Sequence, residues 1–306
     1  MLKNRSERRL IVWFMTPAVL IYGVFFVYPA IQGLLDSLFA WQGLNTNKTF
    51  VGLDNFARLW REFTDPDDFY GLRLYALHNA FILVFGILSV FIGLFVAYLI
   101  NEKPLGYRMY RITFFFPNVL ALPAIAMLWS LVLNPSFGLL NTMLEGIGLG
   151  QFALPWLSLQ YEAPLVRLGL YVVGFIGVWG GIGWFMLVFL AAMQNVPKDY
   201  TEAAIIDGAS RFRIFFSVTL PMIWETFRTV LIYTVIGALG GFAIIYALFG
   251  GKPQKHADMI LNYYYFQAFT EYNWGYAASI AAVMFVITIS LTGLTYALTR
   301  RDSVAY

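Results

Sequence analysis

The sequence contains no cysteine, and this absence excludes disulfide frameworks, thiol catalysis and thiolate metal sites. Charged residues are also scarce: they make up 12% of the 306 residues, whereas 60% are hydrophobic. A soluble domain needs more charge on its surface than this, so the composition indicates an integral membrane protein. The net charge of +3 is small and gives no argument for nucleic-acid binding.

Six apolar stretches have the length of about 20 residues that a helix needs to cross the hydrocarbon core of a membrane. They are 10–35, 79–100, 112–133, 168–193, 229–250 and 277–298. The first is too long for a signal peptide and lacks a cleavage site of small residues, so we expect it to be retained. The sequence therefore predicts an all-α integral membrane protein, with one transmembrane domain over 1–306 and membrane lipid around it.

The distribution of Lys and Arg predicts the orientation of the spans. Thirteen of the twenty lie on one side, in the N-terminus, the 101–111 loop, the 194–228 loop and the C-terminus. Because cytoplasmic loops carry the excess of positive charge, we expect a multi-pass protein of the cell membrane with both termini in the cytoplasm.

Ionisable residues are missing from the six stretches. None of the six contains Asp, Glu, Lys, Arg or His; Asp36 lies at the outer end of the first, and His78 and His256 fall in outer segments. Ion-driven carriers usually need such groups at membrane depth, so an ion-coupled carrier is disfavoured. The sequence also lacks a phosphate-binding glycine loop, a zinc-protease motif and a nucleophile elbow. We therefore expect no enzyme activity, no metal and no cofactor in this chain.

Some aromatic and amide residues lie within the expected spans and allow two interpretations. Trp184, Phe242 and Tyr246 are either packing and interfacial residues or the wall of a pathway where sugar rings stack. Asn118, next to Pro117, is either a partner for a helix kink or a contact for a ligand.

The segment 197–221 stands out because it is polar and lies between two apolar stretches. Pro197 suits a first helical position, Lys198 to Asp207 favours a helix, and Gly208 is suited to a left-handed stop. Ser210 is expected to cap a second helix that ends before Pro221.

The two expected helices of this segment differ in character. The first has a face of small residues, whereas Phe212, Phe215 and Phe216 of the second are expected to pack against the membrane end of the bundle. Arg211 and Arg213 are expected to be solvated or close to lipid phosphates. From periodicity alone, the segment is either a loop packed on its own protein or a surface for a cytoplasmic partner.

The residues of this segment resemble the EAA signature of permease subunits of binding-protein-dependent ABC importers. The matching positions are Glu202, Ala203, Ala204, Asp207, Gly208, Ala209, Ile214, Leu220 and Pro221. Other stretches resemble the carbohydrate branch of that family, with permeases for maltose, glycerol phosphate and oligosaccharides. These stretches are FVYPAIQGLLDSLFAW (26–41), FVGLDNFARL (50–59), FFFPNVLALPAIAMLW (114–129), NPSFGLLN (134–141), GWFMLVFLAAMQNVPKDYTEAA (183–204) and EYNWGYAAS (271–279).

The resemblance implies the type I importer permease fold, with six spans and a cytoplasmic coupling helix at 197–207. It implies a second permease, two ATPase subunits that hold ATP and Mg, and an extracytoplasmic binding protein that delivers a sugar or oligosaccharide. Glu202 would contact the ATPase subunit, Ala203 and Ala204 would enter its groove, and Gly208 would make the turn. The alternatives are a permease for a polyol or glycerol phosphate, and a membrane scaffold or sensor that does not transport.

Two further expectations follow from the resemblance. Many sugar permeases of this branch carry polar residues in the fifth span, where this chain has Gly240 and Ala243. Either the partner permease holds most of the sugar, or small residues widen the cavity. The outer segments 39–77, which includes Asp65, Asp67 and Asp68, and 134–167 are either a docking surface for the binding protein or a polar cap over the helix ends.

Overall fold

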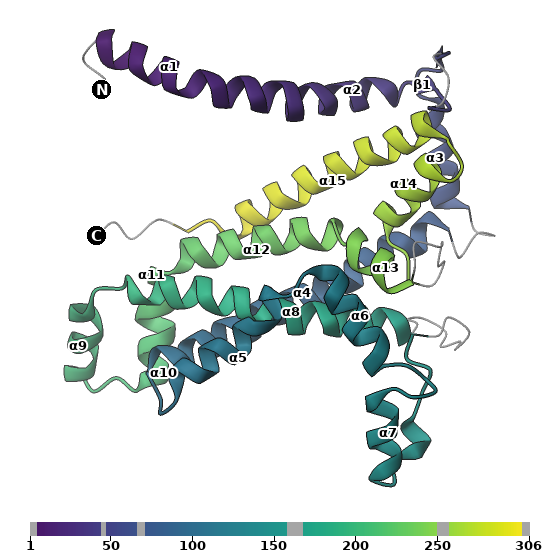
Figure 1. Ribbon diagram of the computed structural model, residues 1–306. Coiled ribbons are helices and arrows are strands. Elements are labelled where there is room, and N and C mark those ends of the chain that lie inside the picture. Colours follow the sequence, from purple (N-terminus) through teal and green to yellow (C-terminus); the bar gives the residue numbers. More distant parts are fainter. Residues whose placement is uncertain (1–4, 44–46, 66–70, 158–167, 250–256, 302–306) are drawn as a thin grey trace. The chain divides into compact units, whose positions relative to one another are not determined.

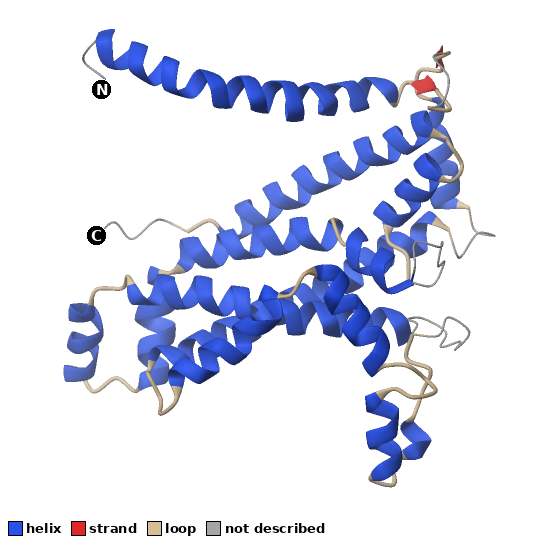
Figure 2. Cartoon of the chain, viewed as in Figure 1, coloured by secondary structure: helices blue, strands red, loops and turns tan. Residues whose placement is uncertain are grey.

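In a computed structural model the chain is almost entirely helical (Figures 1 and 2). The structure describes residues 5–43, 47–65, 71–157, 168–249 and 257–301. Within these ranges four helices are long and apolar enough to cross a membrane, and two bent helix pairs raise this number to six if each pair is one span. The all-α membrane fold is thus confirmed, and the segments divide into two compact units.

Unit 1 contains residues 1–66 and 264–286. Its first span consists of α1 (Arg5–Tyr22), a five-residue π turn (Gly23–Val27) and α2 (Tyr28–Asp36). The widened turn lies just before Pro29, whose ring has no amide to donate and would crowd a regular turn. A short hairpin of β1 (Phe39–Ala40) and β2 (Thr49–Phe50) follows, and then α3 (Asp54–Thr64). The 39–77 segment therefore contains a hairpin and a helix; Asp67 and Asp68 lie outside the described residues.

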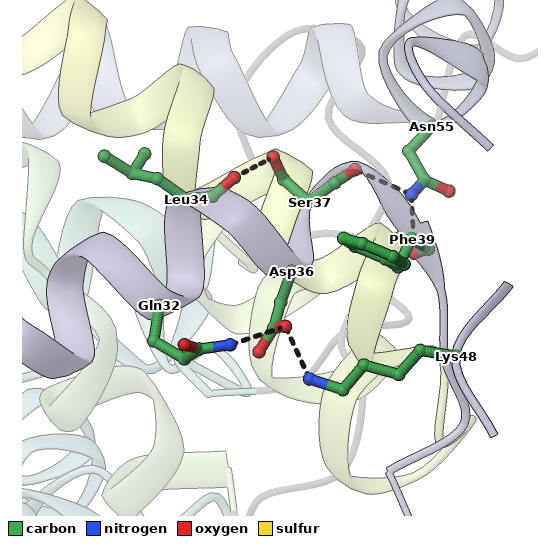
Figure 3. Close-up of polar contacts among 7 residues, drawn as sticks. All are labelled: Gln32, Leu34, Asp36, Ser37, Phe39, Lys48 and Asn55. Atoms are coloured by element: carbon green, nitrogen blue, oxygen red, sulfur yellow. Dashed lines mark hydrogen bonds and ion pairs between the residues drawn. The ribbon is translucent and has the colours of Figure 1, made fainter. Parts of the chain in front are cut away.

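A polar cluster holds the hairpin to the end of the first span (Figure 3). The buried carboxylate of Asp36 accepts hydrogen bonds from Gln32 Nε2 at 3.2 Å and Lys48 Nζ at 2.5 Å. The amide of Asn55 donates to the carbonyl oxygens of Ser37 and Phe39 at 2.8 and 3.0 Å. Asp36 thus ends the span as expected, and its charge is neutralised by a partner twelve residues later.

Unit 2 contains residues 67–263 and 287–306. Its helices are α4 (Leu72–Asn101), α5 (Tyr107–Val119), α6 (Leu122–Val132), α7 (Leu139–Gly146), a 3-10 turn (Gly150–Phe152), α8 (Leu168–Gln194), α9 (Lys198–Ile206), α10 (Arg211–Ile214), a π turn (Phe215–Thr219), α11 (Leu220–Met222), α12 (Trp224–Leu239) and α13 (Phe242–Phe249). Helices α14 (Ile260–Phe269) and α15 (Trp274–Thr299) are divided between the two units.

The core of unit 2 lies between α4 and α8, which approach closely at glycines. A Cβ atom on Gly93 would lie 2.6 Å from Phe185 Cβ, and one on Gly181 would lie 2.8 Å from Ser89 Oγ. Small residues at these positions allow two membrane helices to pack backbone to backbone. In the expected fourth span Gly181 is therefore a packing position, whereas a Cβ on Gly180 would meet open space.

The expected third span, 112–133, is not one straight helix. It is divided into α5 and α6, which meet at an angle of 100°. Leu120 and Ala121 leave the helical conformation, and Pro123, at the start of α6, has no amide with which to continue the hydrogen-bond ladder of α5. The apolar stretch predicted at 112–133 thus forms two helices.

The expected fifth span, 229–250, is also broken. Helix α12 ends at Leu239 and α13 begins at Phe242, with Gly240 and Gly241 between them. Because α12 has 16 residues, it is only about 24 Å long, which is shorter than the hydrocarbon core of a membrane. Met259 leaves no room at the break, since a Cβ on Gly241 would lie 2.8 Å from its sulfur.

Buried polar side chains of α4 satisfy the backbone at this break. The amide of Asn79 donates to Ala238 O at 3.0 Å and accepts from the Ile260 N–H at 3.1 Å. Next to it, Nδ1 of His78 lies 2.7 Å from the carbonyl oxygen of Asp258. His78 was expected in an outer segment, but α4 begins seven residues before the expected span and buries this side chain. His256 lies outside the described residues.

Candidate functional site

Helix α9 begins and ends as the sequence predicts, apart from a shift of one residue. Pro197 is its N-cap rather than its first helical residue, with extended backbone at φ −60° and ψ 133°. At the other end Gly208 has φ +76°, a left-handed conformation that favours glycine. The N–H groups of Gly208 and Ala209 donate to Ile205 O and Ala204 O, each at 3.0 Å. This pair of hydrogen bonds is a Schellman cap, and it fixes the turn after Asp207.

No side chain of α9 is buried in unit 2, and Ile206 is 86% exposed. Glu202 and Ala203 are exposed, and Ala204 is half-buried. In Figure 1, α9 lies beyond the ends of the longer helices of this unit. An exposed isoleucine beside exposed acidic and small residues describes a surface suited to a partner.

The second half of the segment differs from the expectation in two ways. Ser210 caps it as predicted, accepting from the Arg213 N–H at 3.3 Å, but the helical path runs through Leu220 and Pro221 to Met222. The π turn before Leu220 widens the helix, so that the proline ring is accommodated instead of ending it.

Only one of the three phenylalanines packs into the bundle. Phe215 is buried, and its ring lies 4.7 Å from that of Tyr98 on α4. Phe212 and Phe216 are exposed and contact each other at 4.6 Å. A helix places residues one position apart about 100° from each other, so Phe215 and Phe216 cannot both face the bundle. The expectation that all three pack against the membrane end was therefore wrong for two of them.

Arg211 has a protein partner that the sequence did not suggest. Its Nη1 lies 3.0 Å from Glu102 Oε2, at the end of α4. The pair is too exposed to contribute much stability. It does show that the 101–106 turn and the 194–228 loop lie at the same end of unit 2, as their shared positive charge predicted.

Two of the four candidate pathway residues, Asn118 of α5 and Trp184 of α8, lie along one face of α8. Asn118 Nδ2 on α5 donates a hydrogen bond to Gly180 O on α8, so this amide joins two helices. One turn further along α8, the indole of Trp184 stacks on Tyr233 of α12, with ring centroids 4.6 Å apart and planes at 27°. Sequence reasoning missed Tyr233, because only the fold shows which tyrosine faces Trp184.

The other two candidates form a separate pair on α13. The rings of Phe242 and Tyr246 lie 5.2 Å apart, one helical turn from each other. Tyr246 is partly exposed, and the break at Gly240 and Gly241 sets the direction of the helix that carries both rings. Sequence reasoning did not identify Asn79, which holds this break, although a lone amide at the edge of an apolar run was a usable signal.

A cavity in unit 1 involves none of these candidates. It has a volume of about 560 Å³ and lies between α2 and α15. Four alanines line it on α15: Ala277, Ala278, Ala281 and Ala282. Small residues four positions apart are typical of helix-packing faces in membranes, so the size of this cavity gives no reason to place a ligand there.

Helix α7, in the described part of the 134–167 segment, is amphipathic. The Trp156 Nε1 atom donates to Asn141 Oδ1 at 2.7 Å and ties the following loop to the buried side of α7. On the opposite side Phe137, Leu139 and Met143 are exposed.

Residues 89–303 match the family described as "Binding-protein-dependent transport system inner membrane component". The chain belongs to this family. This permease is 33% identical over 284 residues to the probable ABC transporter permease protein YurN of Bacillus subtilis, covering 91% of this chain and 92% of the relative. It is 32% identical over 291 residues to the diacetylchitobiose uptake system permease protein NgcF of Streptomyces coelicolor, covering 92% and 79%.

The permease also has the fold of a solved ABC transporter. A chain of the bacterial transporter involved in the import of the acidic polysaccharide alginate superposes with a TM-score of 0.77 at 22% identity, covering 97% of both chains. The expected type I permease fold is confirmed. As a member of this family, the chain is a membrane transport component and not an enzyme.

Proposed function

We propose that this permease forms half of the translocation pathway of an ATP-driven importer for a sugar or oligosaccharide. A second permease forms the other half, two ATPase subunits hold ATP and Mg on the cytoplasmic side, and an extracytoplasmic binding protein delivers the substrate. Both termini and α9 face the cytoplasm. Support for a sugar comes from the relatives, which include permeases named for diacetylchitobiose and for multiple sugars.

The observation that carries this proposal is the exposed helix α9. Its ends are fixed by a proline cap and a Schellman turn, yet none of its side chains is buried in its own chain. A rigid helix with an exposed surface transmits force to a partner better than a flexible loop. Glu202 provides the polar contact, Ala203 and Ala204 allow a groove to approach the backbone, and Asp207, Gly208 and Ala209 set the turn. Leu220 and Pro221 link the segment to α12.

ATP binding draws the ATPase subunits together and moves α9 with them, which turns the permease halves from inward-open to outward-open. The chemical energy enters through this short contact, so the docking of α9 must differ between the two states. To shift such an equilibrium nearly completely, the difference must be about 5 kcal/mol.

Uptake by the reconstituted complex tests this proposal. ATP-dependent uptake of a labelled oligosaccharide into proteoliposomes is compared for the original chain, Glu202→Ala and Gly208→Pro. We expect both variants to insert normally and to lose most of their uptake, Gly208→Pro the more severely because proline cannot adopt a φ of +76°. Unchanged uptake without any ATPase subunit would show that the proposal is wrong.

A second substrate class is the alternative to a sugar. The relatives also include the sn-glycerol-3-phosphate permease UgpA of Yersinia pestis, 28% identical over 286 residues and covering 93% of this chain. A ligand screen of the purified binding protein separates the two classes. Tight binding of glycerol 3-phosphate, with no binding of oligosaccharides, would mean that the substrate is a phosphorylated polyol and not a sugar. The proposed importer mechanism would stay the same.

A further inference from the structure

The last part of α15 is not packed into the apolar core of unit 2. Residues 287–301 belong to this unit, and none of them is buried. The core between α4 and α8 includes Ile223, Phe227 and Val230 at the start of α12, but no residue of 287–301. A helix end without a buried side chain can move separately from its neighbours, so its polar and ring contacts decide what it follows.

Trp224 holds the end of this helix to the start of α12 (Figure 1). Its Nε1 donates a hydrogen bond at 2.7 Å to the carbonyl oxygen of Thr299, the last residue of α15. The last four carbonyl groups of a helix have no partner within the helix, so this bond satisfies one of them. Trp224 is itself fixed, because its ring stacks on buried Phe227 with centroids 5.1 Å apart.

Two arginine–aromatic contacts cross the same junction in opposite directions. The guanidinium of Arg301, two residues beyond the end of α15, lies 4.1 Å from the centroid of the Trp224 ring. The guanidinium of Arg228 on α12 lies 4.5 Å from the centroid of the Tyr296 ring on α15. Arg228 also forms an ion pair with Glu225, and only 13% of its side chain is exposed, so loss of water strengthens its ring contact. Each side of the junction thus supplies one ring and one cation.

These contacts lie directly after the segment that contains α9. The contacting residues, which we call the clasp, are Trp224, Arg228, Tyr296, Thr299 and Arg301. Helix α11 ends at Met222 and α12 begins at Trp224, and the two helical pieces meet at 73° through buried Ile223. The chain that leaves α9 therefore enters α12 at the clasp.

We propose that the clasp makes the inner end of α15 follow the coupling movement of α9, and that its side chains are positioning residues for transport. This inference rests on the proposed function and deepens it, because it names the contacts that carry the movement to a further helix. Without them α12 would shift with the ATPase subunits, while the end of α15 would stay behind. ATP would then be hydrolysed with less sugar moved.

The two kinds of contact suit a joint that moves as a unit. A hydrogen bond to a carbonyl weakens steeply when its angle changes, so the indole N–H fixes the direction of the end of α15. A guanidinium is attracted to a ring anywhere within about 6 Å of its centroid, so the two ring contacts survive small rotations. Together they keep the helices attached while both change their tilt.

The number of ATP molecules hydrolysed per sugar imported tests this inference. Both rates are measured on proteoliposomes with the complete complex and a labelled trisaccharide. Trp224→Phe keeps a ring but removes the N–H, and Arg301→Gln removes the cation. We expect each variant to raise the ratio of hydrolysis to import about fivefold, the scale of one lost contact.

Arg300→Gln is the matched control, because it makes the same change of charge one residue away. Arg300 is exposed, and its side chain has no partner among the described residues, so the ratio should stay unchanged. Equal ratios for Arg300→Gln and Arg301→Gln would overturn the inference.

A conservative pair separates the ring contact from general damage to the fold. Tyr296→Phe keeps a ring for Arg228 and should keep most of the original ratio, whereas Tyr296→Leu should raise it. A variant that only unfolds loses hydrolysis and import together and leaves the ratio where it was. A raised ratio with Tyr296→Phe as large as with Tyr296→Leu would contradict the ring contact.

Distances between spin labels test the clasp without any uptake. The chain has no cysteine, so Ile236→Cys on α12 and Leu298→Cys on α15, both at exposed positions, provide its only two thiols. In the assembled complex we expect the distance between the labels to be the same without nucleotide and with a non-hydrolysable ATP analogue. In Arg301→Gln the distance should differ between the two states. A difference as large in the original chain would show that α15 does not follow α12.

The two measurements separate the clasp from the proposed function. If the original complex imports no trisaccharide, the proposed function fails for this sugar, and the label distances alone support or overturn the clasp. If it imports the sugar with the same ratio in Trp224→Phe and Arg301→Gln, the clasp is wrong and the proposed function stands.

Discussion

Asn79 shows how one side chain allows a membrane helix to break. In hydrocarbon, backbone groups freed by a break have no water to pair with, and each one left unsatisfied costs several kcal/mol. Asn79 donates to Ala238 O, at the end of α12, and accepts from the Ile260 N–H, at the start of α14. One buried side-chain amide therefore forms hydrogen bonds with both a backbone carbonyl and a backbone N–H that the break leaves unpaired. Asn79 lies 159 residues before Ala238 in the sequence.

We predict that Asn79→Leu destabilises the protein by about 2 kcal/mol or more, because it leaves two buried backbone groups without partners. Thermal unfolding in detergent measures the effect. Asn195→Leu is the control: Asn195 is exposed after α8 and makes no side-chain hydrogen bond within the described residues, so its change stays within about 0.5 kcal/mol. Equal unfolding midpoints for the two variants would contradict the role of Asn79.

At the scale of the element, different residues of α9 stabilise the helix and form its proposed binding surface. Its caps use Pro197 and Gly208, while Ile206 contributes nothing to the packing of the chain. We predict that Ile206→Ser changes the unfolding free energy by less than about 0.5 kcal/mol but weakens the binding of the ATPase subunit about tenfold. Co-purification of the ATPase subunit at graded concentrations measures the second effect.

Leu105→Ser is the matched control for this prediction. Leu105 is 99% exposed, apolar, and lies in the turn between α4 and α5, at the same end of unit 2 as α9. It is not part of α9, so its substitution should leave ATPase binding unchanged. If both variants weaken binding equally, the subunit is held by general apolar adhesion and not by α9.

Local chemistry explains which elements could be predicted from the sequence. Pro197, Gly208 and Ser210 act on their immediate neighbours, so the ends of α9 and the start of α10 were predicted to within one residue. The breaks after Val119 and Leu239 were not predicted, because an apolar stretch has the same sequence pattern whether its helix is straight or divided. What permits the second break is a contact between Asn79 and Ala238, and the Trp184–Tyr233 stack likewise depends on how α8 and α12 pack.

At the scale of the whole molecule, one exposed ion pair determines how the bent pair α5 and α6 is to be understood. The 100° bend is compatible with a broken span or with a re-entrant loop. Glu102 at the end of α4 meets Arg211, which follows the long helix α8. If α8 crosses the membrane once, the chain returns to the Glu102 side only if α5 and α6 together also cross. A re-entrant loop would leave Arg211 on the opposite side from Glu102.

A crossing by α5 and α6 predicts a labelling pattern that the cysteine-free chain makes simple to measure. Leu105→Cys and Ile206→Cys should react with a membrane-impermeant maleimide in inside-out vesicles and not in intact cells. Phe137→Cys, exposed just after α6, should show the reverse. The positive charge of the 101–111 and 194–228 loops predicts that these loops are labelled from the cytoplasmic side. The Arg211–Glu102 contact requires that Leu105→Cys and Ile206→Cys are labelled from the same side. Labelling of Phe137→Cys from the same side as Leu105→Cys would mean that α5 and α6 form a re-entrant loop, and that only five spans cross.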